Sequence, residues 1–377
     1  MKIKVCHVFS DVDQSHLVKT FGDAMDKGKY DISFVFLGLK KPLLFDYFGS
    51  RGHKVEFVEF SGKRDLPKAI WKLRQIFKLW RPDIIHTHLV EGSLAGLTAA
   101  KLSRGNIAIH TRHHGAEAHI YSPHGVYYDR YNNYLSKKII AISNVVSDVL
   151  IARDGVDRSK VVTISHGFHL ENIVDEPGVT ETLKKEYDLN GHYPVVGSVA
   201  RYIHWKGVHN TVKAFASLLE EYPNGKLVLA NASGPYIGEI KTLLTTLPKE
   251  NYVEIEFEPQ MISLYPAFDI FVHIPVQREV EAFGMVYIEP LALGVPSVFT
   301  LSGAACEFVK DKVNALVVPY DDPSATRTAI VSILEDGALR NHIVENGRAD
   351  VWNLFNAERF SAELDALYTD LSSSKGV

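Results

Sequence analysis

Short apolar runs alternate with longer mixed segments along the whole chain. Many of the runs are almost continuously apolar, as at 138–142 and 194–198. Such runs are typical of parallel strands that are covered on both faces. We therefore predict strands at 3–9, 31–38, 55–60, 83–87, 107–111, 138–142, 161–164, 194–199, 226–230, 253–257, 269–274, 297–300 and 315–318. The segments between them have helical periodicity, for example at 66–80, 91–103, 129–136, 207–221, 236–246 and 324–335.

The alternation of strands and helices occurs twice, which predicts an α/β protein with two doubly wound domains. The boundary is expected near 168–190, because the last strand of the first half ends at Ile164 and a polar stretch follows it. We place the first domain at 1–168 and the second at 169–349.

Composition agrees with this interpretation. The chain has 377 residues, of which 46% are hydrophobic and 23% charged, as expected for two soluble domains. No apolar run is long enough to cross a membrane, and Met1 leads into a strand-like segment rather than a signal peptide. Cys6 and Cys306 lie in segments expected to be buried, which favours reduced thiols in a cytoplasmic protein.

Charge is unevenly distributed. Residues 1–164 carry 25 Lys and Arg against 16 Asp and Glu, a balance of +9, and the remainder carries 16 against 29, a balance of −13. A basic half favours an anionic partner, such as a phosphorylated acceptor or the inner face of the cell membrane, and a solvated face without a partner is the alternative. The amphipathic helix expected at 66–80 fits a membrane interface. We favour the alternative that it covers its own sheet.

A candidate ligand site begins after the apolar run at 269–274. There Glu281 precedes Gly284, and the glycine opens a short helix that carries Glu289. Glycine lets the backbone approach a ligand closely, and the free N–H groups of a helix start suit a phosphate. A carboxylate on this helix can accept hydrogen bonds from two hydroxyl groups, as a ribose offers. The alternative is a capped amphipathic helix whose glutamate faces solvent.

A second candidate lies between the strand at 194–199 and the helix that begins near Gly207. Arg201 and Lys206 occupy this loop. Open α/β sheets bind ligands at the carboxyl ends of their strands. Two cations at such a place are suited to a diphosphate, and two solvated cations on an exposed loop are the alternative.

Together the two motifs resemble the retaining glycosyltransferases of family 4. Glu281 and Glu289 have the separation of that family's E-x7-E signature, and Arg201 and Lys206 match its G-R…K-G phosphate motif. The resemblance covers essentially the whole chain. It implies the GT-B architecture, in which two Rossmann-like domains face each other across a cleft and a C-terminal helix, here about 350–377, packs back on the first.

The resemblance also implies roles for individual residues. Arg201 and Lys206 are expected to bind the donor diphosphate, Glu289 the ribose and Glu281 the transferred sugar. The backbone between the two glutamates is expected to complete the donor site through Phe283, Gly284 and Met285.

The first half of the chain adds a group of histidines. The segment 83–88 resembles the family's D-x-x-H-x-H strand end, and 109–115 resembles its T-x-H loop, which places the active-site histidine at His113. His113 is expected to hydrogen-bond a sugar hydroxyl. His16 and His114 are candidate acceptor contacts. Zinc is the alternative for this region, but no recognised zinc spacing is present, so no metal is expected.

The sequence thus predicts an enzyme that transfers a hexose or N-acetylhexosamine from a UDP-sugar or GDP-sugar to an acceptor hydroxyl with retention, in envelope polysaccharide or glycoconjugate synthesis. The acceptor is expected to be a carbohydrate or lipid-linked molecule rather than a nucleic acid. A non-catalytic nucleotide-sugar-binding partner of another transferase is the alternative. A phosphorylase would need a cofactor-lysine signature, and a dehydrogenase a G-x-G-x-x-G after its first strand; neither is found.

Overall fold

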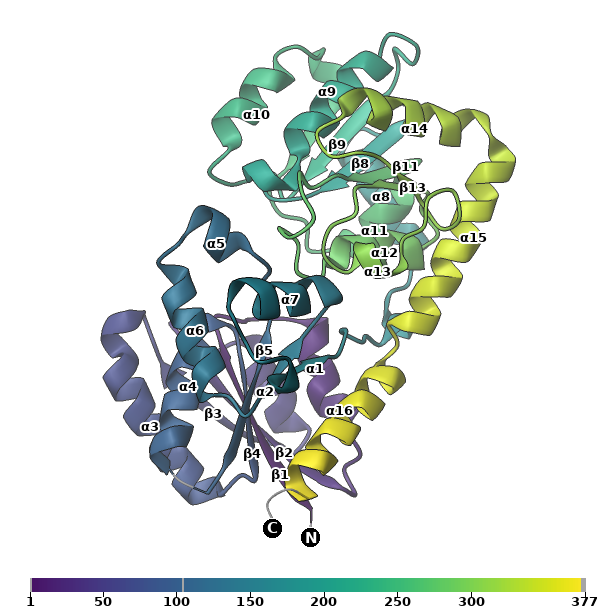
Figure 1. Ribbon diagram of the computed structural model, residues 1–377. Helices are drawn as coiled ribbons and strands as arrows, with labels where there is room; N and C mark the ends of the chain where they lie inside the picture. The colour runs from purple at the N-terminus through teal and green to yellow at the C-terminus, as the bar shows by residue number, and fades with distance from the viewer. Residues whose placement is uncertain (1, 104, 374–377) are drawn as a thin grey trace. The chain divides into compact units, whose positions relative to one another are not determined.

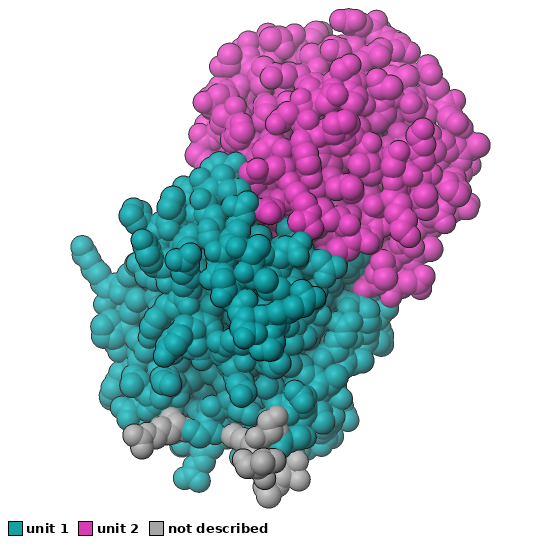
Figure 2. All heavy atoms as spheres, in the orientation of Figure 1, with its two compact units in different colours: residues 1–169, 355–377 teal, residues 170–354 magenta. Residues whose placement is uncertain are grey.

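The computed structural model describes residues 2–103 and 105–373, and it divides the chain into two compact units. Unit 1 consists of Met1–His169 together with Phe355–Val377, and unit 2 is the continuous segment Leu170–Leu354 (Figure 2). The chain therefore leaves unit 1 once and returns to it once. The two connections run side by side within unit 1, where the amide of Phe168 donates to the carbonyl of Phe355 at 2.8 Å.

Unit 1 is built on a parallel seven-stranded sheet with the order β3-β2-β1-β4-β5-β6-β7 (Figure 1). The strands are β1 Ile3–Ser10, β2 Tyr30–Gly38, β3 Lys54–Glu59, β4 Ile84–His88, β5 Ile107–Arg112, β6 Lys138–Ala141 and β7 Val161–Thr163. The helices are α1 His16–Asp23, α2 Leu43–Ser50, α3 Leu66–Trp80, α4 Val90–Ser103, α5 Glu117–Tyr121, α6 Gly125–Leu135, α7 Asn144–Asp148 and α16 Ala357–Ser373. Strands β2 and β3 lie on one side of β1, and β4 to β7 lie on the other, so the strand order reverses between β1 and β4.

The sheet of unit 1 has a separate hydrophobic core on each face, because successive side chains of a strand point to opposite sides. Val5 and Phe9 of β1 belong to one core, and Cys6 and Val8 belong to the other. The first core includes residues of α1, α2 and α16, and the second includes residues of α3 and α4. Both faces are therefore covered by helices, which explains the near-continuous apolar runs of these strands.

Helix α3 covers the sheet, as the favoured interpretation predicted. Its residues Ala69, Leu73 and Phe77 are buried in the second core of unit 1, and Ile70 and Trp80 pack against that core. The apolar stripe is therefore not available to a membrane. Trp71 and Leu79 point away from this core and are 60% and 79% exposed.

Unit 2 repeats the plan with a parallel six-stranded sheet of order β10-β9-β8-β11-β12-β13. Its strands are β8 Val195–Val199, β9 Lys226–Ala230, β10 Tyr252–Ile255, β11 Ile270–His273, β12 Ser297–Phe299 and β13 Leu316–Val317. Its helices are α8 Pro177–Glu186, α9 Val208–Leu218, α10 Ile237–Leu244, α11 Met261–Leu264, α12 Met285–Ala292, α13 Ala305–Phe308, α14 Pro323–Glu335 and α15 Gly337–Leu354. Here the reversal of strand order falls between β8 and β11.

All predicted strands are present, with ends that differ by no more than two residues, and the two doubly wound α/β folds are confirmed. The C-terminal segment differs from the expectation of one helix at about 350–377. The residues at 350–354 still belong to α15 in unit 2, and Phe355 and Asn356 separate it from α16. The last four positions of the expected helix, 374–377, lie outside the described residues. Cys6 is buried, whereas Cys306 is only half-buried on α13.

Candidate functional site

The candidate site of unit 2 lies where the order of its strands reverses. The loop that carries Arg201 and Lys206 follows the carboxyl end of β8, and the loop that carries Glu281 follows β11. Strands β8 and β11 are hydrogen-bonded neighbours. In open α/β sheets the crevice at such a switch point is the usual place for a ligand. The topology therefore brings together the two motifs that the sequence places 75 residues apart.

Gly207 holds the loop after β8 against the end of β11. Its φ angle is +71°, and a Cβ atom at this position would lie 1.9 Å from the carbonyl oxygen of Ile274. No L-residue fits there without moving one of the two loops. The close approach fixes the position of the preceding residue, Lys206.

Glu281 lies at the centre of a buried ion-paired cluster. Its Oε1 accepts hydrogen bonds from Lys206 Nζ at 2.5 Å and from His273 Nε2 at 3.1 Å. Burial alone would raise the pKa of the Glu281 carboxyl, but the Lys206 charge and the hydrogen bonds from His273 and Lys206 outweigh it and lower the pKa to about 2. Glu281 is therefore ionised at neutral pH and fixed in position.

His273 is a member of this cluster that the sequence analysis missed. It is the last residue of β11 and is 1% exposed. Burial lowers its pKa, so the ring is neutral at physiological pH. Its position in an apolar strand gave no separate signal, because a lone histidine in such a run is also typical of ordinary core packing.

Helix α12 begins at the predicted glycine. Gly284 is its N-cap with a φ angle of +86°, and Met285 is the first helical residue. Phe283 is buried and anchors the turn. The N–H groups of the first turn of a helix have no partners within the helix, so this end attracts an anion. Arg201 is exposed at the end of β8, where its guanidinium is accessible.

Glu289 lies one turn further along α12 and is held by Tyr265. The Tyr265 hydroxyl, which is fully buried, donates to Glu289 Oε2 at 2.7 Å. Burial raises the pKa of Glu289 to about 7, and the hydrogen bond from Tyr265 opposes this shift without cancelling it. The two glutamates of the motif thus differ sharply: Glu281 is firmly ionised, whereas Glu289 changes its protonation state near neutral pH.

Of the three predicted histidines of unit 1, His113 and His114 lie just after the carboxyl end of β5. His113 follows β5 and its Nε2 lies 3.2 Å from Nδ1 of His88, the last residue of β4. His114 is bound to both carboxyl oxygens of Asp129, at 3.0 and 3.1 Å. His16 is the first residue of α1 and its side chain is exposed.

A buried ionic network supports the loop that carries these histidines. Arg112, which is 2% exposed, lies 2.9 Å from Asp129 and 3.3 Å from Asp154. His119 Nε2 lies 2.6 Å from the second of these carboxylates. Sequence reasoning did not find this network, because its members come from four separate segments. His119 and His114 thus each have a carboxylate partner that fixes the orientation of the ring.

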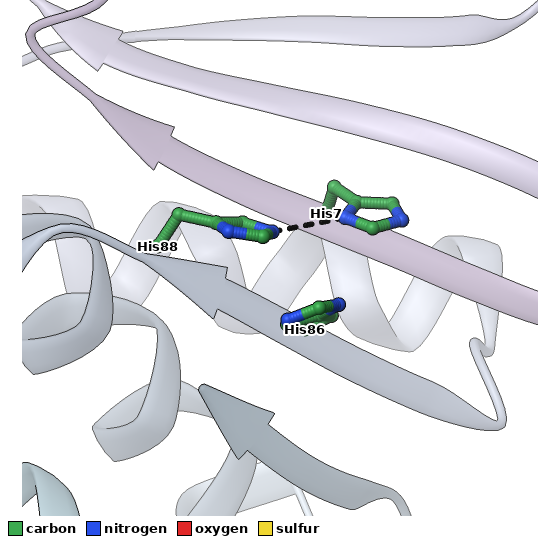
Figure 3. Close-up of side chains that lie close together, drawn as sticks. All are labelled: His7, His86 and His88. Carbon is green, nitrogen blue, oxygen red and sulfur yellow. Dashed lines mark hydrogen bonds between the residues drawn. The ribbon is translucent and has the colours of Figure 1, made fainter. Parts of the chain in front are cut away.

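His7, His86 and His88 form the one group of side chains among the described residues that brings three metal-ligand atoms together, within 4.8 Å of one another (Figure 3). The rings of His86 and His88 pack against each other at a tilt of 34°, with centroids 4.2 Å apart. Both nitrogens of His86 are engaged, one with the Tyr368 hydroxyl and one with the Thr111 hydroxyl, each at 2.7 Å. A metal ion would have to break these bonds and separate the packed rings, so the geometry fits a hydrogen-bonded cluster better than a metal centre.

Comparison with known proteins identifies the family of this chain. The family model described as "Glycosyltransferase Family 4" matches residues 14–172, and the one described as "Glycosyl transferases group 1" matches residues 179–350. The chain belongs to glycosyltransferase family 4. It is accordingly a glycosyltransferase, as the sequence analysis predicted.

Two relatives cover most of the chain. The capsular polysaccharide biosynthesis glycosyltransferase CapM of Staphylococcus aureus is 28% identical over 83% of this chain and 85% of its own length. The N-acetyl-alpha-D-glucosaminyl L-malate synthase of Bacillus anthracis is 24% identical over 98% of both chains. The names of these two relatives describe different activities, so membership of the family alone does not identify a substrate.

Solved structures confirm the GT-B fold. Anabaena Alr3699/HepE in complex with UDP and glucose superposes with a TM-score of 0.80 over 97% of this chain and 99% of that chain, at 18% identity. Sucrose-phosphate synthase from Thermosynechococcus elongatus superposes with a TM-score of 0.78 over 99% and 100% of the two chains, at 19% identity. At these sequence identities the superpositions establish a shared fold only. No helix in the described part of the chain is long and apolar enough to cross a membrane.

Proposed function

We propose that this glycosyltransferase moves a hexose or an N-acetylhexosamine from a nucleoside-diphosphate sugar to an acceptor hydroxyl with retention of anomeric configuration. The observation that carries the proposal is the cluster at the strand-order reversal of unit 2. There a fixed anion, Glu281, a cation, Lys206, and the start of α12 lie on adjacent loops. This combination provides both a binding site for a sugar hydroxyl and positive charge for a departing diphosphate.

Each group has a role in this proposal. Arg201, Lys206 and the first turn of α12 stabilise the negative charge that grows on the leaving diphosphate in the transition state. Glu289 accepts hydrogen bonds from the ribose hydroxyls, and Tyr265 holds it in place. Glu281, held by Lys206 and His273, accepts from a hydroxyl of the transferred sugar.

Lys206 has a double role in this proposal, because its ammonium pairs with Glu281. An ammonium has three donors, so the group can bind a phosphate oxygen without leaving the carboxylate. The charge of Glu281 is then balanced before and after the donor binds. His113 in unit 1 is proposed to hydrogen-bond a sugar hydroxyl, with His16 and His114 as acceptor contacts.

The comparisons support the choice of substrates. Anabaena Alr3699/HepE has been crystallised with UDP-glucose, and CapM is a capsular polysaccharide glycosyltransferase. We therefore propose a UDP-sugar or GDP-sugar as donor and a carbohydrate or lipid-linked acceptor in envelope polysaccharide or glycoconjugate synthesis. No metal is required, because the two cations and the helix start supply the positive charge that the diphosphate needs.

A thermal-shift panel of UDP-, GDP-, ADP- and CMP-sugars tests the donor site. One nucleotide class is expected to raise the melting temperature of the wild type and not that of Glu289→Ala, since a ligand that binds only the folded state stabilises it. Hydrolysis or transfer of the same donor sugar is then measured. Binding without turnover towards any acceptor would favour the non-catalytic alternative, and no binding at all would contradict the proposed donor site.

Contact with the inner face of the cell membrane remains a prediction from the basic charge of the first half. The basic residues of α3, with exposed Trp71 and Leu79, are the proposed contact surface. Lys72→Gln and Lys78→Gln together are expected to weaken binding to anionic liposomes at low salt. Absence of wild-type binding under these conditions would exclude the contact.

A further inference from the structure

A continuous row of hydrogen-bonded imidazoles runs through unit 1 from the middle of β1 to the loop after β5. His7 Nδ1 lies 3.0 Å from His88 Nε2, and His88 Nδ1 lies 3.2 Å from His113 Nε2. Figure 3 shows the first of these contacts, with the two rings edge to edge. Strands β1 and β4 flank the strand-order reversal of unit 1, so the row lies where an α/β sheet binds its ligand.

All three rings are neutral at physiological pH. Burial lowers the pKa of His7 and of His113 to about 3, and it holds the pKa of His88 well below the usual value. A neutral imidazole carries one proton, so the three rings share three N–H groups. Each of the two contacts uses one of them. The third N–H must therefore lie at one end of the row, either on His7 Nε2 or on His113 Nδ1.

The two ends differ in their surroundings. His7 Nε2 is buried and has no hydrogen-bond partner among the described residues, and its ring packs against Phe21 and Phe34. A buried N–H without a partner is rarer than a buried acceptor without one. His113 is only partly buried, and none of the described groups is hydrogen-bonded to its Nδ1. The third proton is consequently expected on His113.

We propose that His88, supported by His7, is a positioning residue that holds His113 as the Nδ1–H tautomer. His7 donates from Nδ1 to His88 Nε2, His88 donates from Nδ1 to His113 Nε2, and His113 is left with a single donor at Nδ1. This inference rests on the proposed function for the identity of the ligand, which is a sugar hydroxyl oxygen acting as acceptor. His113 thus binds as a hydrogen-bond donor and has no free lone pair for use as a base.

The tautomer is tested directly by ¹⁵N NMR of histidine-labelled full-length protein, with His113→Asn to assign the signal. The wild type is expected to show His113 protonated at Nδ1 and His88 protonated at Nδ1. The ring nitrogen shifts need neither donor nor acceptor, so this result is independent of the proposed function. Protonation of His113 at Nε2 in the wild type would overturn the inference.

Two substitutions at His88 separate positioning from packing. His88→Asn keeps an amide N–H near the place of Nδ1, so the His113 tautomer should persist. His88→Leu fills a similar volume without a donor, so His113 should show a mixture of tautomers and kcat/KM should fall roughly fivefold, as expected for the loss of one hydrogen bond. An equal loss of kcat/KM in both variants, with the tautomer of His113 unchanged, would show that His88 acts only by packing.

Tyr368→Phe is the matched control, because it removes a hydrogen bond from His86 in the same core without touching the row. It should leave the His113 signal unchanged. Zinc titration of the wild type covers the remaining possibility. Stoichiometric zinc binding that shifts the signals of His7, His86 and His88 would replace the hydrogen-bonded row with a metal site and overturn the inference. If no donor sugar is turned over, the NMR outcome still decides the tautomer.

Discussion

At the residue scale, Glu281 and Lys206 form a short ion pair in unit 2 that is largely shielded from solvent. The carboxylate side chain is 8% exposed and the ammonium side chain 22%. Removing one member of a buried pair leaves the other charge without compensation, and this is more harmful than losing the pair as a whole. The pair therefore links the stability of unit 2 to the geometry of the candidate donor site.

Lys206→Met is expected to lower the free energy of unfolding by about 2 kcal/mol, less than for a fully buried pair because the lysine is partly exposed. This stabilisation is present above the ordinary glutamate pKa of 4.5 and is lost as the pH falls towards 2. Urea unfolding at pH 7 measures it. The double variant Lys206→Met with Glu281→Gln should recover part of the loss. A double variant as unstable as the sum of the two single variants would contradict the coupling.

Donor binding should depend on pH through Glu289. Its pKa of about 7 means that the carboxylate form, which accepts from the ribose hydroxyls, is lost as the pH falls through neutrality. Donor affinity is expected to be about tenfold lower at pH 6 than at pH 8, following the ionised fraction. Calorimetric titration with the donor nucleotide at both values tests this. Glu289→Gln should bind the donor nucleotide weakly and with the same affinity at both pH values. A pH dependence that persists in this variant would belong to another group.

The sequence indicated both glutamates, both cations and His113, because each lies within a short motif. It did not indicate His273, Tyr265 or His7. Tyr265 and its partner Glu289 are 24 positions apart in the sequence, and His7 and its partner His88 are 81 positions apart. No local pattern reports such a contact, since it depends on which strands become neighbours in the sheet.

At the element scale, the strands were predictable because a strand that is buried on both faces needs apolar residues on both sides. Helices α1 and α2 were not singled out, since both are only eight residues long and carry too few turns for a clear period. The junction of α15 and α16 was missed for another reason. Phe355 and Asn356 interrupt two helices without glycine or proline, and the amide of Phe168 fixes this break.

The two sides of α3 should respond very differently to substitution. Leu73→Ala is expected to lower the free energy of unfolding by about 2–5 kcal/mol, because it leaves a cavity in the second core of unit 1. Trp71→Ala, on the exposed side, should change it by less than about 0.5 kcal/mol. Thermal or chemical unfolding of both variants provides the comparison. Similar effects of the two substitutions would mean that the apolar stripe of α3 is not packed as described.

Gly207→Ala tests the close approach of the loop after β8 to the end of β11. The substitution places a methyl group against the Ile274 carbonyl, so the loop must move and take Lys206 with it. Donor affinity is expected to fall at least tenfold, because a displaced ammonium reaches neither the carboxylate nor the diphosphate. Gly178→Ala is a control, since a Cβ atom there meets nothing within 4 Å. Unchanged donor binding in Gly207→Ala would contradict the proposed role of this contact.

At the scale of the whole molecule, unit 2 is a continuous insertion into unit 1. Residues 170–354 contain one complete core and all the proposed donor contacts except His113. A fragment with this range is expected to fold and to be stabilised by the same nucleotide as the full chain. Circular dichroism and thermal shift check both points. A fragment that folds but ignores every nucleotide would show that unit 2 is not sufficient for donor binding.

Unit 1, in contrast, consists of two separate segments of the chain, and the C-terminal helix α16 completes one of its cores. Phe360, Leu364, Tyr368 and Leu371 of this helix are buried against side chains of the sheet, α1 and α2. The order of synthesis then matters. Domains generally fold as they leave the ribosome, yet the first unit of this enzyme to begin is the last to be finished. Until α16 emerges, the growing chain carries a completed unit 2 and a sheet of unit 1 with one open apolar face. Chaperones that bind such faces can therefore act for longest while residues 170–354 are being made.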